Sequence, residues 1–345
     1  MMLKLSILSL GLGFAAHWFA VAFGINATTI PYLEEIMNTA IALSLYINVL
    51  NIDTTLFKRH LGLIIRILVL GVPIKIVLPG FILALLSPIL APVAYLCATV
   101  IAQIDPIASA KSLDSSNISK KSETILRAWT SFDDPISILF AFYIFLPLLV
   151  STNFSWSQYF VRIGADIVGC FTVYYLSKWI KTIRPNLKNF LEIIFVIIII
   201  VYSVLSDSFL LSAFAGLFLR PPASDKLEIM VSPIFYCSVI IIGLLSTNLT
   251  FDWLSGGILA FSTFFLGQVI VTLLFLKESM ANKARVMFGH QNGMTAILLT
   301  VAIEVAGSEK TRNLLSVTLP AIILIALFYF LTNYLLDRTL LRTQI

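Results

Sequence analysis

The feature that most constrains this chain is a succession of apolar segments separated by short polar breaks. An α-helix needs about 20 apolar residues to cross a bilayer, so a chain that repeats such segments is expected to form a bundle of membrane-spanning helices. The eighth segment is short for a full crossing. The sequence predicts about twelve segments: 3–25, 35–52, 61–86, 90–110, 123–149, 158–180, 189–206, 208–220, 231–249, 253–276, 284–306 and 313–336.

The composition supports this interpretation. Hydrophobic residues make up 59% of the chain and charged residues only 12%, with a mean hydropathy of +0.97. About a quarter of the residues of a soluble domain are charged. We therefore expect an all-α integral membrane protein that lies in the lipid bilayer. The first apolar run is too long for a signal peptide, so we expect it to remain as a membrane helix.

The net charge of +5 does not indicate nucleic-acid binding, because the basic residues gather in alternate loops. These clusters are Lys58 and Arg59; Lys111, Lys120 and Lys121; Lys178, Lys181, Arg184 and Lys188; Arg220 and Lys226; Lys277, Lys283 and Arg285; and Arg338 and Arg342. Only Lys310 and Arg312 interrupt the alternation. The positive-inside rule then predicts that both termini lie in the cytoplasm. We expect the protein to lie in the plasma membrane.

Two acidic steps lie inside apolar segments, Asp105-Pro106 and Asp133-Asp134-Pro135. A carboxylate at membrane depth costs about 2.5–3.5 kcal/mol on insertion scales. A proline inside a helix removes a backbone hydrogen bond, so each step is expected to open its helix and free a carbonyl. Oxygen-rich irregular backbone beside a carboxylate suits a monovalent cation. The alternative for Asp105-Pro106 is that it only caps a helix end.

The predicted topology brings these steps to a similar depth. Segments 90–110 and 123–149 run antiparallel, and Asp133 lies about 15 Å from the cytoplasmic end of its helix. Asp133 and Asp134 are separated by about 100° around the helix, so they are expected to face different neighbours. Adjacent carboxylates in such a site titrate as a coupled pair.

A second interruption, Phe288-Gly289-His290-Gln291-Asn292-Gly293-Met294-Thr295, lies near the C-terminus. Broken segments in the two halves of a transporter are typical of inverted repeats that meet at the substrate site. A tight glycine packing contact is the alternative interpretation.

The cysteines and histidines indicate no metal centre. Cys97, Cys170 and Cys237 are far apart in apolar segments and are interpreted as small core residues, and His17, His60 and His290 form no local pair. We expect no cofactor.

Three motifs carry a family resemblance: Leu43 to Asp53, Gln103-Ile104-Asp105-Pro106 and Phe132-Asp133-Asp134. In this order and spacing the chain resembles the monovalent cation/proton antiporter superfamily, the sodium/proton exchangers. The resemblance extends from about residue 35 to 180 and returns more weakly at 253–306.

The resemblance implies about twelve transmembrane helices with inverted repeats and crossed, unwound helices at the ion site. Residues 1–345 would form a single transmembrane transporter domain, with core helices at about 61–149 and 253–336 and the remaining helices serving as a scaffold in a homodimer. Asp134 would bind the cation and the proton, Asp133 would be its partner, and Asp105 would mark the unwound crossing. The supporting residues would be Ile104, Ser131, Thr130, Gln268, Gln291 and Asn292.

The chain departs from the family in several places. Ile104 replaces a threonine, and Gln268 is the best match to the lysine that electrogenic members carry in the tenth core helix. One branch of the family carries an Asn-Asp pair with an acidic residue shortly before it and an arginine late in the chain. In this sequence that acidic position falls on Trp129, and the position of the arginine falls on Gln291 or Asn292. Lys75 is the first candidate for a counter-charge to Asp133, but we favour snorkelling of Lys75 to the surface.

The resemblance implies an antiporter, not an enzyme, in which Na⁺ or K⁺ binds transiently at Asp134 and Asp133 and competes with protons. Three alternatives remain: a sodium-coupled organic-anion symporter of the same architecture, a non-transporting relative and an intramembrane aspartyl protease. The adjacency of Asp133 and Asp134 is unsuited to a protease dyad.

Overall fold

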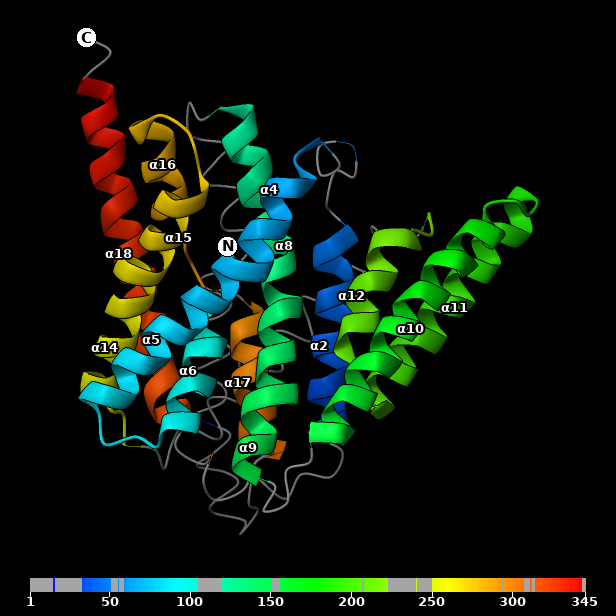
Figure 1. Cartoon of the computed structure of the whole chain (residues 1–345), viewed down its shortest axis with the longest axis horizontal. Helices are drawn as coiled ribbons and strands as arrows, with labels where there is room; N and C mark the ends of the chain where they lie inside the picture. The colour runs from blue at the N-terminus through cyan, green and yellow to red at the C-terminus, as the bar shows by residue number, and fades with distance from the viewer. Residues whose placement is uncertain are drawn as a thin grey trace. The chain divides into compact units, whose positions relative to one another are not determined.

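The computed structural model of the chain describes residues 33–50, 59–104, 119–150, 156–206, 208–222, 250–292, 294–306 and 314–342 and the single positions 15, 55, 240 and 311. Within these residues all regular secondary structure is helical (Figure 1). The chain divides into two compact units. The first comprises residues Met1–Asn51, Phe142–Leu249 and Ile297–Arg312, and the second comprises residues Ile52–Ala141, Thr250–Ala296 and Asn313–Ile345.

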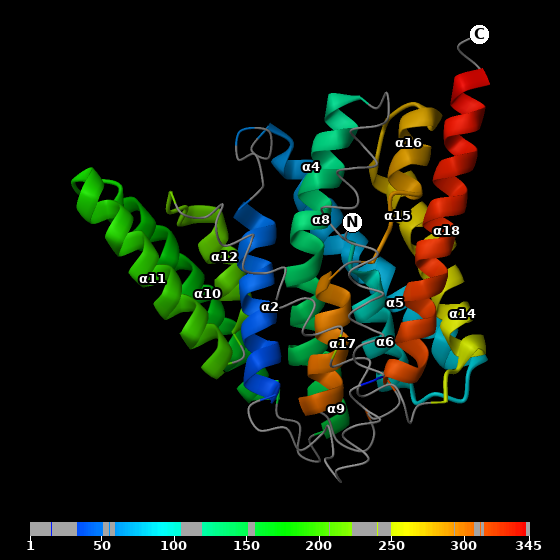
Figure 2. The same ribbon diagram turned by 180° about the vertical axis from the view of Figure 1, so that it is seen from behind.

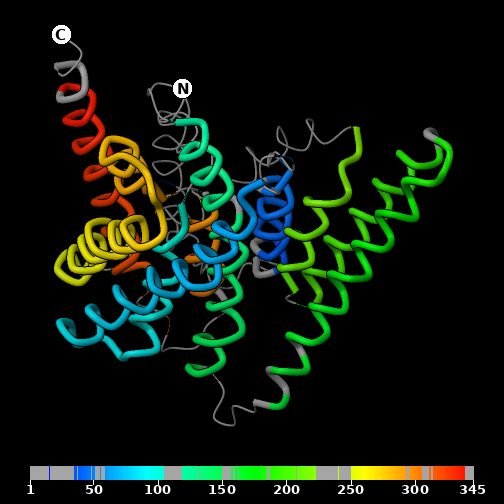
Figure 3. The backbone as a smooth tube through the Cα atoms, turned by 45° about the horizontal axis from the view of Figure 1, so that its top comes forward, coloured from blue at the N-terminus to red at the C-terminus, as the bar shows by residue number. Residues whose placement is uncertain are grey.

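In the first unit, α12 lies between its neighbours and contacts each of them. The helices of this unit are α2 (Leu33–Leu50), α9 (Leu146–Val150), α10 (Trp156–Ile180), α11 (Pro185–Ser206) and α12 (Phe209–Phe218). Helices α2, α10 and α11 all pack on α12, and α10 and α11 form the hairpin drawn in green in Figure 3. A Cβ atom at Gly216 would lie 2.2 Å from the Tyr46 carbonyl oxygen, so only glycine allows this close crossing of α2 and α12.

The second unit is built around α5, which packs on α6, α8 and α14. Its elements are α4 (Leu61–Arg66), η2 (Ile67–Gly71), α5 (Val72–Leu86), α6 (Ala91–Ala102), α8 (Lys120–Phe140), α14 (Trp253–Phe261), η4 (Ser262–Gly267), α15 (Gln268–Phe275), α16 (Met280–Met287) and α18 (Leu314–Arg342). Helix α17 (Met294–Ala306) begins in this unit. Helices α14 and α18 lie side by side (Figure 2).

Five helical stretches of the described residues are long and apolar enough to cross a membrane: Leu61–Leu86, Lys120–Leu149, Leu187–Ser206, Trp253–Phe275 and Leu314–Arg338. Shorter apolar helices lie at Asn38–Ile47, Ala91–Ala102, Phe209–Phe218 and Thr295–Glu304. The prediction of an all-α membrane protein is confirmed. Apart from the single positions 15 and 240, predicted segments 3–25 and 231–249 lie outside the described residues. The count of twelve helices and the inverted repeats stay predictions, as do the core and scaffold roles.

Short π-helical turns lie inside three of the long helices without interrupting them. They are η2, η3 (Ala141–Phe145) and η4. Helix α8 also continues through Pro135, so the prediction that the Asp133-Asp134-Pro135 step opens its helix is wrong. Proline withholds only its own backbone donor, and the hydrogen bonds of the neighbouring residues keep the helix continuous.

Candidate functional site

Helix α8 carries both adjacent aspartates into the interior of the second unit. Ser119 caps the helix by accepting a hydrogen bond from the Ser122 backbone N–H, and Glu123 lies in the first turn. Such a cap and an acidic first turn stabilise a helix N-terminus. Asp133 is 0% and Asp134 1% exposed, so both carboxylates depend on protein groups for stabilisation.

The partner of Asp133 is Lys75 of α5. Lys75 Nζ lies 2.9 Å from Asp133 Oδ2, and both side chains are fully buried. The ammonium also lies 5.5 Å from the centre of the Trp129 ring, a cation–π distance. The interpretation that Lys75 snorkels to the surface is therefore wrong, because a carboxylate and an aromatic face hold its charge inside the protein.

Lys75 packs against Gly267, the last residue of η4. A Cβ atom at Gly267 would lie 3.4 Å from Lys75 Cγ and 3.5 Å from Lys75 Cα. Gly267 directly precedes Gln268, the position matched to the lysine of electrogenic relatives. The positive charge beside Asp133 is thus supplied from α5, by Lys75.

Gln268 itself is directed elsewhere. It is fully buried, and its Nε2 donates to the Val286 carbonyl at 3.1 Å. This bond connects α15 with the last turn of α16.

Asp134 faces a different element from Asp133, as the helical geometry predicted. Thr295 Oγ1 donates to Asp134 Oδ2 at 2.7 Å. Thr295 is the last residue of the second interruption and lies in the first turn of α17. Sequence reasoning singled out this interrupted segment but did not assign Thr295 to the aspartates. The signal was a hydroxyl residue in the first turn of the helix that follows two glycines.

The two interrupted segments meet at Asn292. Helix α6 ends at Ala102, and Gln103 has extended backbone angles of φ −65° and ψ 140°. Asn292 Nδ2 donates to the carbonyls of Ile101 and Gln103, both at 2.9 Å. The side-chain amide therefore satisfies carbonyls that the end of α6 leaves without helical partners.

Several buried polar atoms surround this meeting point. Asp133 Oδ1, Gln103 Oε1 and Asn292 Oδ1 have no hydrogen-bond partner within the described residues, and neither does either ring nitrogen of His290. His290 is fully buried, with its ring 6.3 Å from that of Phe264. Buried polar atoms need a partner, and carboxylate and amide oxygens are ligands for hard cations.

The remaining predicted site residues differ in their surroundings. Thr130 Oγ1 donates to the Arg127 carbonyl in its own helix, Ile104 is fully buried, and Gln291 is half-buried. The side chain of Ser131 and the whole of Asp105 lie outside the described residues. Cys97 and Cys170 are buried. Among the described residues, no three His, Cys, Asp or Glu side chains form a metal-binding group.

A family profile described as "Sodium/hydrogen exchanger, transmembrane" matches residues 3–220. The chain belongs to this sodium/hydrogen exchanger family. The match includes Lys75, Asp133 and Asp134, whereas Gln268, Asn292 and Thr295 lie beyond it. A family of transporters also agrees with the expectation that the protein is not an enzyme.

Solved structures show the same fold over nearly the whole length of the exchanger. The sodium proton antiporter MjNhaP1 from Methanocaldococcus jannaschii at pH 8 is 16% identical, with a TM-score of 0.64, and the match covers 97% of this chain and 96% of that chain. A three-dimensional electron-microscopy map of the same antiporter gives 16% identity, a TM-score of 0.65 and coverage of 96% and 95%. No curated protein sequence matches this chain.

Proposed function

We propose that this exchanger is a monovalent cation/proton antiporter in which Na⁺ or K⁺ and protons compete for Asp134. The observation that carries the proposal is the unequal pairing of the two acids. Asp133 forms an ion pair with Lys75 at 2.9 Å, whereas Asp134 accepts a hydrogen bond from the Thr295 hydroxyl at 2.7 Å.

The charges of these side chains support competition at one place. With Lys75, Asp133 and Asp134 all ionised, their sum is one negative charge. One proton or one monovalent cation neutralises it, and a charge buried without compensation is unfavourable. A proton bound at Asp134 therefore disfavours a cation there, and a cation disfavours the proton.

Ligands for the cation are close to Asp134. The Thr295 hydroxyl donates to the carboxylate and retains lone pairs that a bound ion can use. Asn292, three residues earlier, fixes the end of α6 through its amide nitrogen. A small set of carboxylate, hydroxyl and amide oxygens suits a dehydrated alkali cation.

Antiport also requires that the site open alternately to the two sides of the membrane. We include alternating access, a homodimer and a plasma-membrane location with cytoplasmic termini in the proposal. The alternation in the sequence between loops with Lys or Arg and loops without them supports this orientation.

The test is proton movement in everted membrane vesicles. Addition of Na⁺ or K⁺ should dissipate an imposed proton gradient in wild-type vesicles, and Asp134→Asn should abolish the response. Because Asn cannot exchange a proton but nearly preserves the shape, a correctly folded D134N protein isolates the carboxylate chemistry. The absence of any response to Na⁺, K⁺ or Li⁺ across neutral and alkaline pH would contradict the proposal.

A further inference from the structure

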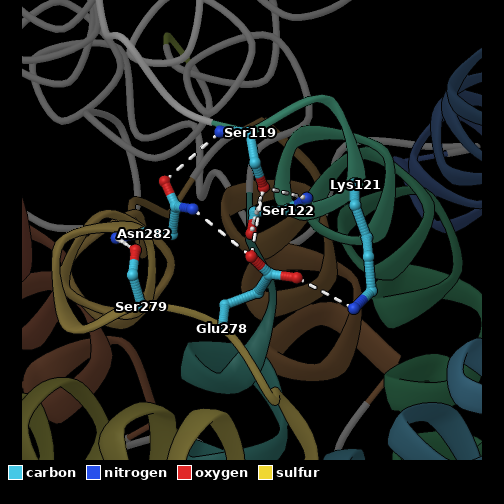
Figure 4. Close-up of polar contacts among 6 residues, drawn as sticks. All are labelled: Ser119, Lys121, Ser122, Glu278, Ser279 and Asn282. Atoms are coloured by element: carbon cyan, nitrogen blue, oxygen red, sulfur yellow. Dashed lines mark hydrogen bonds and ion pairs between the residues drawn. The ribbon is translucent and has the colours of Figure 1, made fainter.

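Glu278 lies in the short connection between α15 and α16, and its carboxylate binds the beginning of α8 (Figure 4). Its Oε1 accepts from Lys121 Nζ at 2.8 Å. Its Oε2 accepts from Asn282 Nδ2 at 3.3 Å and from Ser119 Oγ at 3.5 Å. One carboxylate therefore joins side chains from the first turns of two helices.

A second bridge runs in parallel with the first. Asn282 Oδ1 accepts from the Ser119 backbone N–H at 3.2 Å. Ser119 is the N-cap of α8, and Ser279, which accepts from the Asn282 N–H, is the N-cap of α16. Each cap region is thus tied to the other helix as well as to its own. We call Ser119, Lys121, Glu278 and Asn282 the polar clamp.

The opposite end of α16 is also fixed. The Arg285 guanidinium pairs with the Asp337 carboxylate of α18. Asn333, also of α18, donates through Nδ2 to the Phe288 carbonyl at 3.0 Å. Helix α16 is only eight residues long, so attachments at both ends fix its position within the second unit.

The two helices joined by the polar clamp lead to the two sides of the candidate site. Helix α8 carries Asp134, and α16 leads directly into the interrupted segment that holds Asn292 and then Thr295. A shift between α8 and α16 would change the distance between Asp134 and Thr295, which form a hydrogen bond.

We propose that Glu278 and Asn282 are positioning residues for transport, which hold α16 against α8 so that Thr295 stays in contact with Asp134. This role rests on the proposed antiport function. It differs from a pH sensor, since the Lys121 ammonium keeps the pKa of Glu278 below its usual range and the carboxylate stays charged around neutral pH.

The test compares Glu278→Ala with Glu123→Ala. Glu123 forms an ion pair of similar kind with Arg127, at 2.9 Å, but within α8. Long-range coupling residues typically change an equilibrium by about 0.5–2 kcal/mol, which is roughly 2- to 30-fold. E278A should raise the half-saturating cation concentration by about this factor with a nearly unchanged maximal rate. E278Q, which retains an acceptor oxygen, should have a smaller effect, and E123A should have none.

Backbone hydrogen exchange in residues 288–296 tests the clamp without transport. E278A should accelerate exchange of these amides, whereas E123A should leave it unchanged. If E278A exchanges like the wild type, or E123A raises the cation requirement as much as E278A, the positioning role is overturned. A wild-type protein without antiport activity would contradict the proposed function, whereas the exchange result would still decide the clamp.

Discussion

Lys75 and Asp133 form a buried ion pair with 2.9 Å between Nζ and Oδ2, although 58 residues separate them in the chain. The pair joins α5 to α8 and places a positive charge one residue away from Asp134. Asp133 thus forms the ion pair, whereas Asp134 accepts a hydrogen bond from the Thr295 hydroxyl.

Lys75→Met should destabilise the protein strongly. It removes the charge but keeps an unbranched stem beside Gly267, so Asp133 is left buried without its counter-charge. Breaking one side of a buried pair typically costs about 3–5 kcal/mol. Thermal unfolding of the purified protein in detergent measures the loss. The double variant K75M/D133L should have an unfolding temperature closer to that of the wild type than K75M has. Equal unfolding temperatures of K75M and the wild type would show that the pair contributes no stability.

Thr295→Val should weaken cation competition with protons. The substitution keeps the shape but removes the hydroxyl that stabilises ionised Asp134. A hydrogen bond to a charged group contributes about 1.5–3 kcal/mol, so the half-saturating cation concentration should rise roughly 10- to 150-fold. Thr295→Ser keeps the hydroxyl and serves as the control. A T295V protein with wild-type cation dependence would exclude a role for the Thr295 hydroxyl.

Asn292→Ala should loosen the meeting point of the interrupted segments. It leaves the Ile101 and Gln103 carbonyls without the bonds they receive from Nδ2. Leaving a buried polar group unsatisfied costs about 1–3 kcal/mol. Thermal unfolding should therefore occur at lower temperature in N292A, whereas the half-buried neighbour Gln291→Ala should change it little. Equal effects of the two variants would contradict the proposed support of α6 by Asn292.

Gly216→Ala should disrupt the packing of α2 on α12. The added Cβ would approach the Tyr46 carbonyl oxygen to 2.2 Å, and backbone atoms cannot move aside as a flexible side chain can. Overpacking of this kind typically costs about 1–3 kcal/mol. Gly164→Ala is the matched control, because nothing lies within 4 Å of its added Cβ and alanine favours a helix. Denaturation of both variants should show loss of stability only in G216A.

The contribution of Glu278 to stability should disappear at acid pH. Its folded-state pKa is lowered mainly by the hydrogen bond from Lys121, so the contribution is complete above the usual glutamate pKa. It is lost as pH falls through the lowered folded-state value. The difference in thermal unfolding between wild type and E278Q should be constant near neutral pH and shrink below about pH 4. A difference that persists unchanged in strong acid would rule out this ionisation as its source.

Much of the helical architecture could be predicted because lipid imposes a simple pattern on the sequence. Segment 61–86 was predicted with the bounds that the helical stretch Leu61–Leu86 has in the structure, since apolar length alone sets such limits. The second interruption was also predictable, because glycines and polar residues in an apolar run disfavour a continuous membrane helix. The effect of Pro135 was predicted wrongly, since one missing donor does not determine whether the adjoining turns remain helical.

The sequence by itself determined that the protein is an all-helical membrane protein with interrupted segments and with acidic residues whose burial in the membrane is energetically costly. It also determined the family resemblance. These depend on composition and local spacing. Only the tertiary structure decided that Lys75 pairs with Asp133, that Thr295 contacts Asp134 and that Asn292 caps α6. Each of these contacts joins helices far apart in the chain, and its formation depends on where those helices cross. The direction of a long side chain at such a crossing follows from the space and charge around it, which no local pattern records.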